Sequence, residues 1–132
     1  MVLADTSVWV RFLANRTPYA PELDRLLDRD EVAGHDLICG ELLIGDPGRR
    51  GDLLKSYVLM HRVSGVPHAE VAAFVEAYNL YGRGIGWTDA HLLASAVVIN
   101  IPVWTADERF TRLTNELGAG YVPSAKQAEG RT

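Results

Sequence analysis

Four acidic side chains of this sequence stand among residues that are otherwise apolar: Asp5, Glu41, Asp89 and Asp107. Glu41 lies in the run Ile-Cys-Gly-Glu-Leu-Leu-Ile, where almost every neighbour on a helical wheel is apolar. We therefore expect its carboxylate to be at least half buried. An ionised carboxylate there costs several kcal/mol unless a cation or a dense hydrogen-bond network compensates it.

Asp89 and Asp107 each begin an apolar helix face, and Asp5 ends a short apolar strand. The apolar residues that follow at helical spacing are Leu92, Leu93 and Ala96 after Asp89, and Phe110, Leu113 and Leu117 after Asp107. If the acids converge, each close pair repels by roughly 4 kcal/mol at about 4 Å and an effective dielectric constant near 20. Taken singly, an aspartate at a helix start also fits a cap or a favourable charge on the helix dipole.

A divalent cation would remove that repulsion. All four side chains are oxygen ligands, and no Cys or His cluster has the spacing of a zinc site. The expected ion is therefore Mg²⁺ or Mn²⁺. Such ions commonly serve phosphate chemistry, in which they orient a phosphodiester and deliver a bound water as the nucleophile. The pattern thus favours phosphodiester hydrolysis.

Short apolar strands alternate with helices along the chain, which indicates an α/β layer fold with a mainly parallel sheet. We expect strands at 2–5, 32–36, 62–64, 102–105 and 121–122. Helices are expected around Val8 to Leu13, from near Pro21, and at 37–44, 51–61, 67–81, 88–99 (with Thr88 as its cap) and 107–117. Parallel sheets place their sites beyond the carboxyl ends of the strands, so Asp5 and Asp107 are predicted to share one rim.

Length and composition indicate one compact domain over 1–132, with 123–132 as a frayed tail. The single cysteine, Cys39, allows no intramolecular disulfide. We find neither a signal-peptide pattern nor an apolar run of the roughly 20 residues that cross a bilayer, so we expect a cytoplasmic protein. The net charge of −4 argues against nonspecific coating of nucleic acid, although a bound cation would reverse the local field.

With the acids in this order, the chain resembles the PIN-domain family, and within it the VapC-like toxins of toxin–antitoxin pairs. The matching segments are Val-Leu-Ala-Asp-Thr-Ser-Val-Trp from Val2, Glu41 in its apolar helix, Thr-Asp-Ala-His-Leu-Leu-Ala-Ser-Ala from Thr88, and Val-Trp-Thr-Ala-Asp-Glu-Arg-Phe from Val103. The resemblance implies a three-layer α/β/α domain with four or five strands. It also implies a Mg²⁺-dependent endoribonuclease that acts on RNA, forms a homodimer and is silenced by a VapB-like antitoxin.

Carried over residue by residue, the four acids match the family's acidic quartet, which is both catalytic and metal-binding. Ser7 and Thr105 match its hydroxyl positions beside the metal, although capping explains them equally well. Arg11 and Arg109 are our candidates for gripping RNA phosphates, because they lie within a turn or two of the acids. His91 is an unusual residue in its motif, and we interpret it as structural.

Two other functions fit parts of this pattern. An α/β phosphatase or phosphotransferase would use Asp5 as a covalent nucleophile, but phosphatases of that kind usually have a second aspartate two positions on, where this chain has Ser7. A catalytically silent PIN-like binding module would act only through its partner, and the retention of all four acids speaks against it. The sequence leaves open the RNA target, the antitoxin, the dimer surface and whether one or two ions bind.

Overall fold

Four short strands form one parallel sheet. The structure is a computed structural model that describes residues 1–45 and 51–124, with residues 51 and 52 described by their backbone alone. Strands β1 (Val2–Ala4), β2 (Val32–Gly34), β3 (His61–Arg62) and β4 (Val103–Trp104) lie in the order β3-β2-β1-β4. The three apolar strands β1, β2 and β4 are buried, and the polar β3 forms an exposed edge.

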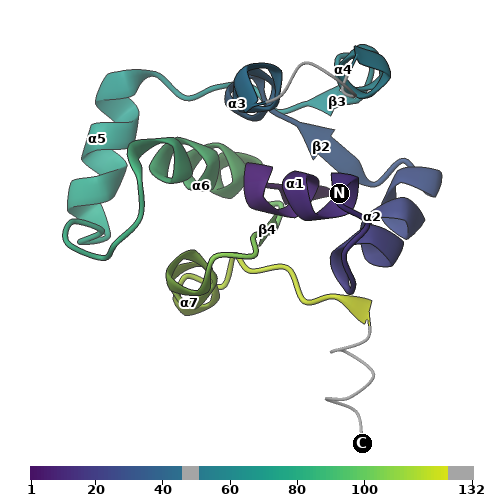
Figure 1. Cartoon of the computed structure of the whole chain (residues 1–132). Helices are drawn as coiled ribbons and strands as arrows, with labels where there is room; N and C mark the ends of the chain where they lie inside the picture. The colour runs from purple at the N-terminus through teal and green to yellow at the C-terminus, as the bar shows by residue number, and fades with distance from the viewer. Residues whose placement is uncertain (46–50, 125–132) are drawn as a thin grey trace, which may run out of the picture.

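Helices cover both faces of this sheet, which gives the three-layer α/β/α architecture that the sequence predicted. The helices within the described residues are α1 (Thr6–Leu13), α2 (Tyr19–Asp28), α3 (Asp36–Gly45), α4 (Gly51–Tyr57), α5 (His68–Ala77), α6 (Trp87–Ile99) and α7 (Glu108–Glu116). Figure 1 shows α2 on one side of the sheet and α6 on the other, with α5 outside α6. Across residues 1–45 and 51–124, no helix has the length and apolar content to cross a membrane.

The core lies between the sheet and these helices. Leu3, Trp9, Ile38, Leu93 and Phe110 are all 0% exposed, and they come from β1 and from four different helices. Burying side chains of this size contributes roughly 1.5 to 3 kcal/mol each, so the core fixes where each helix begins relative to the strand ends. That placement is what brings chemistry-bearing residues to one edge.

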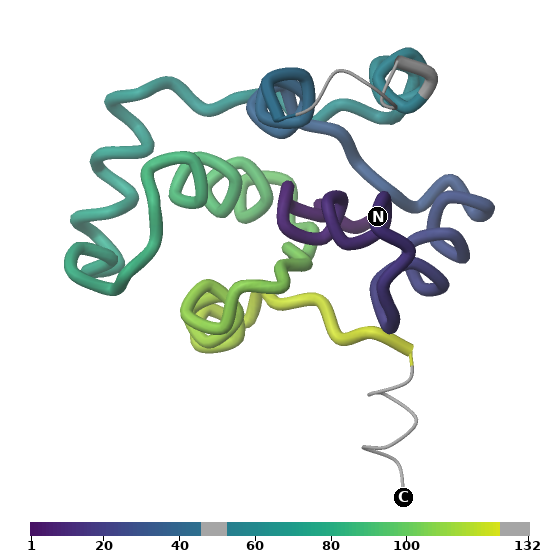
Figure 2. Tube along the Cα trace, viewed as in Figure 1, coloured from purple at the N-terminus to yellow at the C-terminus, as the bar shows by residue number. Residues whose placement is uncertain are grey.

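The topology places a switch point at the carboxyl ends of β1 and β4. From β1 the chain moves outward through β2 to β3 and then crosses back to β4, on the other side of β1. Neighbouring strands whose connections leave in opposite directions form a switch point, where open α/β sheets bind their ligands. The tube in Figure 2 follows this path, with the teal and green segments returning past the purple N-terminal segment.

Several boundaries differ from those that the sequence predicted, and three of them lie at the ends of helices. Helix α6 begins at Trp87 with Gly86 as its N-cap, so the predicted cap Thr88 lies inside the helix. Helix α5 ends at Ala77 rather than residue 81, because Asn79 adopts a left-handed conformation (φ 54°) that no helix continues. Helix α4 ends at Tyr57 rather than residue 61.

The predicted strand at 121–122 is wrong. A single bridge joins Gly120 to Val103, and the chain then leaves the sheet. Tyr121 is drawn instead toward α2, where its hydroxyl donates to Glu22 Oε2 over 3.3 Å. The first residues of the predicted frayed tail are also tied down, because the Ser124 N–H donates to the same carboxylate. Residues 125–132 lie outside the described part of the chain.

A buried histidine gives the fold a predictable response to acid. His35 is 2% exposed, its Nδ1 accepts from the Leu37 N–H (3.1 Å), and its Nε2 lies 3.1 Å from Ser95 Oγ. Because Ser95 Oγ donates to the His91 carbonyl, Nε2 carries the proton and the ring is neutral. Burial lowers the pKa of His35, the nearby Asp36 carboxylate raises it, and His91 lowers it further.

At pH values below about 6.5 we expect the free energy of unfolding to decrease, because His35 binds a proton in the unfolded chain but not in the folded protein. The loss is at most about 1.4 kcal/mol per pH unit for this one group. Urea unfolding of wild type and His35→Gln between pH 7.5 and 5 measures it. The variant should show a shallower dependence on pH, and equal slopes in the two proteins would refute the role of His35.

Candidate active site

Asp5 leaves the end of β1 and caps α1. It is 5% exposed, and its Oδ1 accepts from the Val8 N–H over 3.2 Å and from the Ser7 hydroxyl. Burial raises the pKa of the Asp5 carboxyl, and the hydroxyls of Ser7 and Thr105 act in the opposite direction. Asp5 is therefore held rigidly at the strand end. Because burial destabilises its charged form, a cation bound next to the carboxylate would stabilise it.

Ser7 and Thr105 join the ends of β1 and β4. Ser7 Oγ accepts from the Ala106 N–H over 2.9 Å and lies 3.4 Å from Thr105 Oγ1. Thr105 Oγ1 in turn accepts from the Asp107 N–H over 3.1 Å. The two hydroxyls thus hold the segments that carry Asp5 and Asp107 next to each other. They also cap the chain locally, so both roles that the sequence left open are present.

Asp107 and Asp89 each hold the first turn of a helix. Asp107 Oδ1 accepts from the Phe110 N–H over 2.9 Å at the start of α7, and Asp89 Oδ2 accepts from the Gly86 N–H over 3.2 Å at the start of α6. Helix α6 precedes β4 and runs back along the sheet, so its N-terminus lies at the same rim as the strand ends. Asp89 is partly buried there, whereas Asp107 is exposed, although the sequence placed it on a buried face.

Glu41 is exposed, and the prediction that its neighbours bury it is wrong. Leu42 is buried, but two apolar residues of the same helix, Leu43 and Ile44, are themselves 61% and 86% exposed. Glu41 is nevertheless directed to the rim, because the Thr6 hydroxyl of α1 donates to its Oε1 over 2.7 Å. Sequence reasoning missed Thr6, since a contact across 35 positions leaves no local pattern.

The four carboxylates act on one another at the rim. Burial raises the pKa of Asp89, the Gly86 N–H lowers it, and the negative charges of Asp5, Asp107 and Glu41 raise it again. No Lys, Arg or His among the described residues forms an ion pair with any of the four. Within the same part of the chain, Asp89, Asp107 and Glu41 each have one carboxylate oxygen that accepts no hydrogen bond. Within residues 1–45 and 51–124, no cationic side chain therefore compensates the negative charge of this region.

The donor set fits a hard divalent cation, although the side chains do not form a finished cage. Across residues 1–45 and 51–124, no three His, Cys, Asp or Glu side chains are grouped closely enough to hold a metal ion. The carboxylates of Asp5 and Asp89 are the better fixed of the four, since both are at least partly buried and hydrogen-bonded to backbone N–H groups. Free carboxylate oxygens and mutual repulsion suit Mg²⁺ or Mn²⁺, which prefer oxygen ligands.

The two arginines proposed to grip RNA are both engaged with the protein. Arg11 Nη1 donates to the Ser7 carbonyl over 3.0 Å, and its guanidinium lies 5.6 Å from the centre of the Tyr19 ring. Arg109 is exposed and packs over Gly84, where an added Cβ would meet its Cδ at 2.7 Å. Gly84 also has a φ of +79°, so the loop before α6 needs glycine there.

His91 makes an edge contact with Trp87 (5.0 Å), which agrees with a structural role.

We expect Ser7→Ala to lower the phosphodiesterase activity that the sequence predicts roughly tenfold without unfolding the protein, because a site displaced slightly from its productive geometry loses much of its rate. The change removes the donor to Asp5 and the acceptor for the Ala106 N–H. Ser7→Thr, which keeps the hydroxyl, should recover most of the activity. Steady-state kinetics with thermal melts test this, and unchanged kcat in Ser7→Ala would show that the hydroxyl does not position Asp5.

Comparisons with known proteins agree with this architecture. The model of the PIN domain family matches residues 2–116. A protein named Ribonuclease VapC32, from two strains of Mycobacterium tuberculosis (CDC 1551 / Oshkosh and H37Rv), is 38% identical over 123 residues, which cover 92% of this chain and 97% of the relative. The crystal structure of PAE2754 from Pyrobaculum aerophilum superposes with a TM-score of 0.56 at 16% identity, covering 84% and 82% of the two chains. That structural likeness shows the fold alone.

Proposed function

Because this chain belongs to the PIN-domain family, we propose that it is a metal-dependent endoribonuclease, the toxin of a toxin–antitoxin pair. The observation that carries the proposal is the acidic rim itself. Three carboxylates, from two helices and a strand end, act on Asp89 at the start of a third helix, and no cationic side chain of the described residues is paired to any of the four. A relative named as a ribonuclease covers nearly the same length and supports the assignment.

In this proposal, Asp5, Glu41, Asp89 and Asp107 hold Mg²⁺ or Mn²⁺. The ion would neutralise the phosphodiester and make water a stronger nucleophile. Asp5 is fixed by Ser7 and by the Val8 N–H, so it suits the position of a permanent ligand. Since Asp5 is 5% exposed and its Oδ1 accepts two hydrogen bonds, it is less suited to attack phosphorus as a nucleophile.

Asp89 is our candidate for accepting the proton of the attacking water. Asp89 is only partly buried, and its Oδ1 accepts no hydrogen bond from the described residues, so this oxygen can face the water. Hydrolysis of this kind leaves a 3′-hydroxyl and a 5′-phosphate. Incubation of the purified protein with total RNA and Mg²⁺, followed by end mapping, tests the function. Products with 2′,3′-cyclic phosphate ends, or no cleavage of any RNA, would contradict it.

We further propose a homodimer, a cytoplasmic location and a VapB-like antitoxin as partner. Ile44 and Leu59 are 86% and 85% exposed in the single chain, and a partner that covered them would bury apolar surface. A small open reading frame next to this one would support the toxin assignment. Co-expression of its product should restore growth of cells that the toxin arrests.

A further inference from the structure

A cavity of about 520 Å³ lies directly beside the acidic rim. Thr105 and Ala106 form part of its wall, and the same two residues carry the hydrogen bonds to Asp107 and Ser7. One short peptide after β4 therefore borders the candidate active site and this cavity. A molecule held in the cavity would therefore lie next to the residues that position Asp5 and Asp107.

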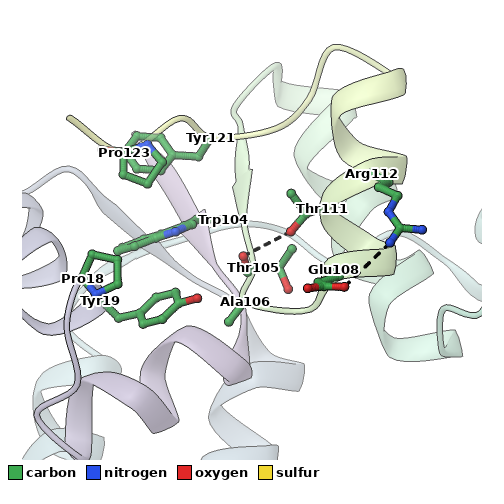
Figure 3. A pocket seen from close by; sticks show the side chains of 10 residues that line it. All are labelled: Pro18, Tyr19, Trp104, Thr105, Ala106, Glu108, Thr111, Arg112, Tyr121 and Pro123. Atoms are coloured by element: carbon green, nitrogen blue, oxygen red, sulfur yellow. Dashed lines mark hydrogen bonds and ion pairs between the residues drawn. The ribbon is translucent and has the colours of Figure 1, made fainter. Parts of the chain in front are cut away.

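One wall of the cavity is aromatic and the facing wall is polar. Figure 3 shows the Trp104 ring between those of Tyr121 and Tyr19, and the ring centres lie 5.4 Å and 5.9 Å from that of Trp104. Helix α7 faces them with a hydroxyl, a carboxylate and a guanidinium, from Thr111, Glu108 and Arg112. Flat apolar surface beside hydrogen-bonding groups is what a nucleobase requires.

The aromatic wall is fixed in place by charged groups behind it. Glu22 accepts from the Tyr121 hydroxyl (3.3 Å), from the Ser124 N–H and from Arg25 Nε (2.6 Å). On the other side, the Arg11 guanidinium lies 5.6 Å from the Tyr19 ring centre. The cavity is thus preformed, so a ligand would not have to order it on binding.

We propose that this cavity receives an unpaired nucleobase of the RNA, close to the phosphate that is cut, and that it sets part of the sequence preference. The inference rests on the proposed function. A base suits the cavity better than a phosphate does, because the Arg112 guanidinium at its lining is already paired with the Glu108 carboxylate, 3.7 Å away, and the pair leaves no net positive charge for an anion. Glu108 and Thr111 would read the polar edge of the base, and Tyr19 would contact its ring.

The four nucleoside 5′-monophosphates, added to metal-free protein in a chelator, are suitable probes. In an NMR titration we expect the strongest shifts at residues 19, 104–106, 111 and 121, with one base favoured over the others. Tyr19→Ala should weaken binding about tenfold, while Tyr19→Phe, which keeps the ring, should bind as wild type does. Tyr81→Ala is the matched control, because that tyrosine is 68% exposed and does not line the cavity.

Cleavage by the full chain provides the second readout. Tyr19→Ala should raise KM for RNA with little change in kcat, and Glu108→Gln and Thr111→Val should alter which sequences are cut. Glu108→Gln and Thr111→Val change residues at the surface or at the edge of the cavity, so they test the proposal even if Tyr19→Ala fails to fold. The proposal would be overturned if Glu108→Gln and Thr111→Val left KM and the cleavage pattern unchanged, or if the nucleotides shifted resonances elsewhere in the protein. It would also be overturned if these variants lost antitoxin binding alone. If nucleotides bind here but wild type cleaves no RNA, the proposed function fails and the base site stands.

Discussion

Asp89→Asn is expected to lower RNA cleavage at least about 100-fold, the lower end of what a positioned general base contributes. The amide keeps an oxygen that can accept from the Gly86 N–H, so the start of α6 should be preserved. What disappears is the charge that binds a cation and the basicity that accepts a proton. Single-turnover cleavage of one RNA measures the effect, with Asp24→Asn, an exposed aspartate of α2, as the matched control.

The same substitution should stabilise the metal-free protein. Removing a charge that is disfavoured first by partial burial and then by three neighbouring carboxylates is expected to raise Tm by roughly 3 to 6 °C, because a change of about 1 kcal/mol shifts Tm by several degrees in a domain of this size. Thermal melts in a chelator show this directly. Full activity in Asp89→Asn would refute its assignment, and a lower Tm would show that the carboxylate stabilises the fold more than its neighbours repel it.

Chelation should abolish activity almost completely. We expect EDTA to leave less than about 1% of the cleavage rate and Mg²⁺ or Mn²⁺ to restore it, because a metal-delivered nucleophile and charge neutralisation account for most of the catalysis. Metal should also stabilise the wild type and so raise its Tm. At a metal concentration a hundredfold above Kd, the free energy of unfolding should increase by about 2.7 kcal/mol.

Asp5→Asn separates specific binding from a general salt effect. This variant should lose both the activity and the metal-induced rise in Tm, while Asp24→Asn should keep both. Cleavage that persists in EDTA, or equal stabilisation of wild type and Asp5→Asn by Mg²⁺, would contradict a metal site built on these acids.

The sequence predicted the rim because its signals were local. A buried strand that ends in Asp5, and an apolar helix that begins close to Asp89, place both carboxylates at the carboxyl edge of a parallel sheet by topology alone. Helical periodicity could not show that α3 leaves Leu43 and Ile44 uncovered, because a pattern of apolar residues does not say whether the cover belongs to the same chain. Glu41 is exposed for that reason.

Contacts between segments that are distant in the sequence could not be predicted from it. Thr6 and Glu41 are 35 positions apart, and Glu22 captures Tyr121 and Ser124 from about a hundred positions away. Tyr121 has the β-propensity of a strand residue, yet a buried carboxylate on α2 competes successfully for its hydroxyl. The aromatic cavity results from this competition.

The most direct measurement is a crystal structure of the protein soaked in Mn²⁺, with anomalous differences collected at a wavelength where manganese scatters anomalously. We predict an anomalous peak within coordination distance, about 2.0 to 2.5 Å, of Asp5 and Asp89 oxygens, with Glu41 and Asp107 turned toward it. A well-ordered crystal in which that rim has no peak, or in which Mn²⁺ binds only elsewhere, would contradict the account.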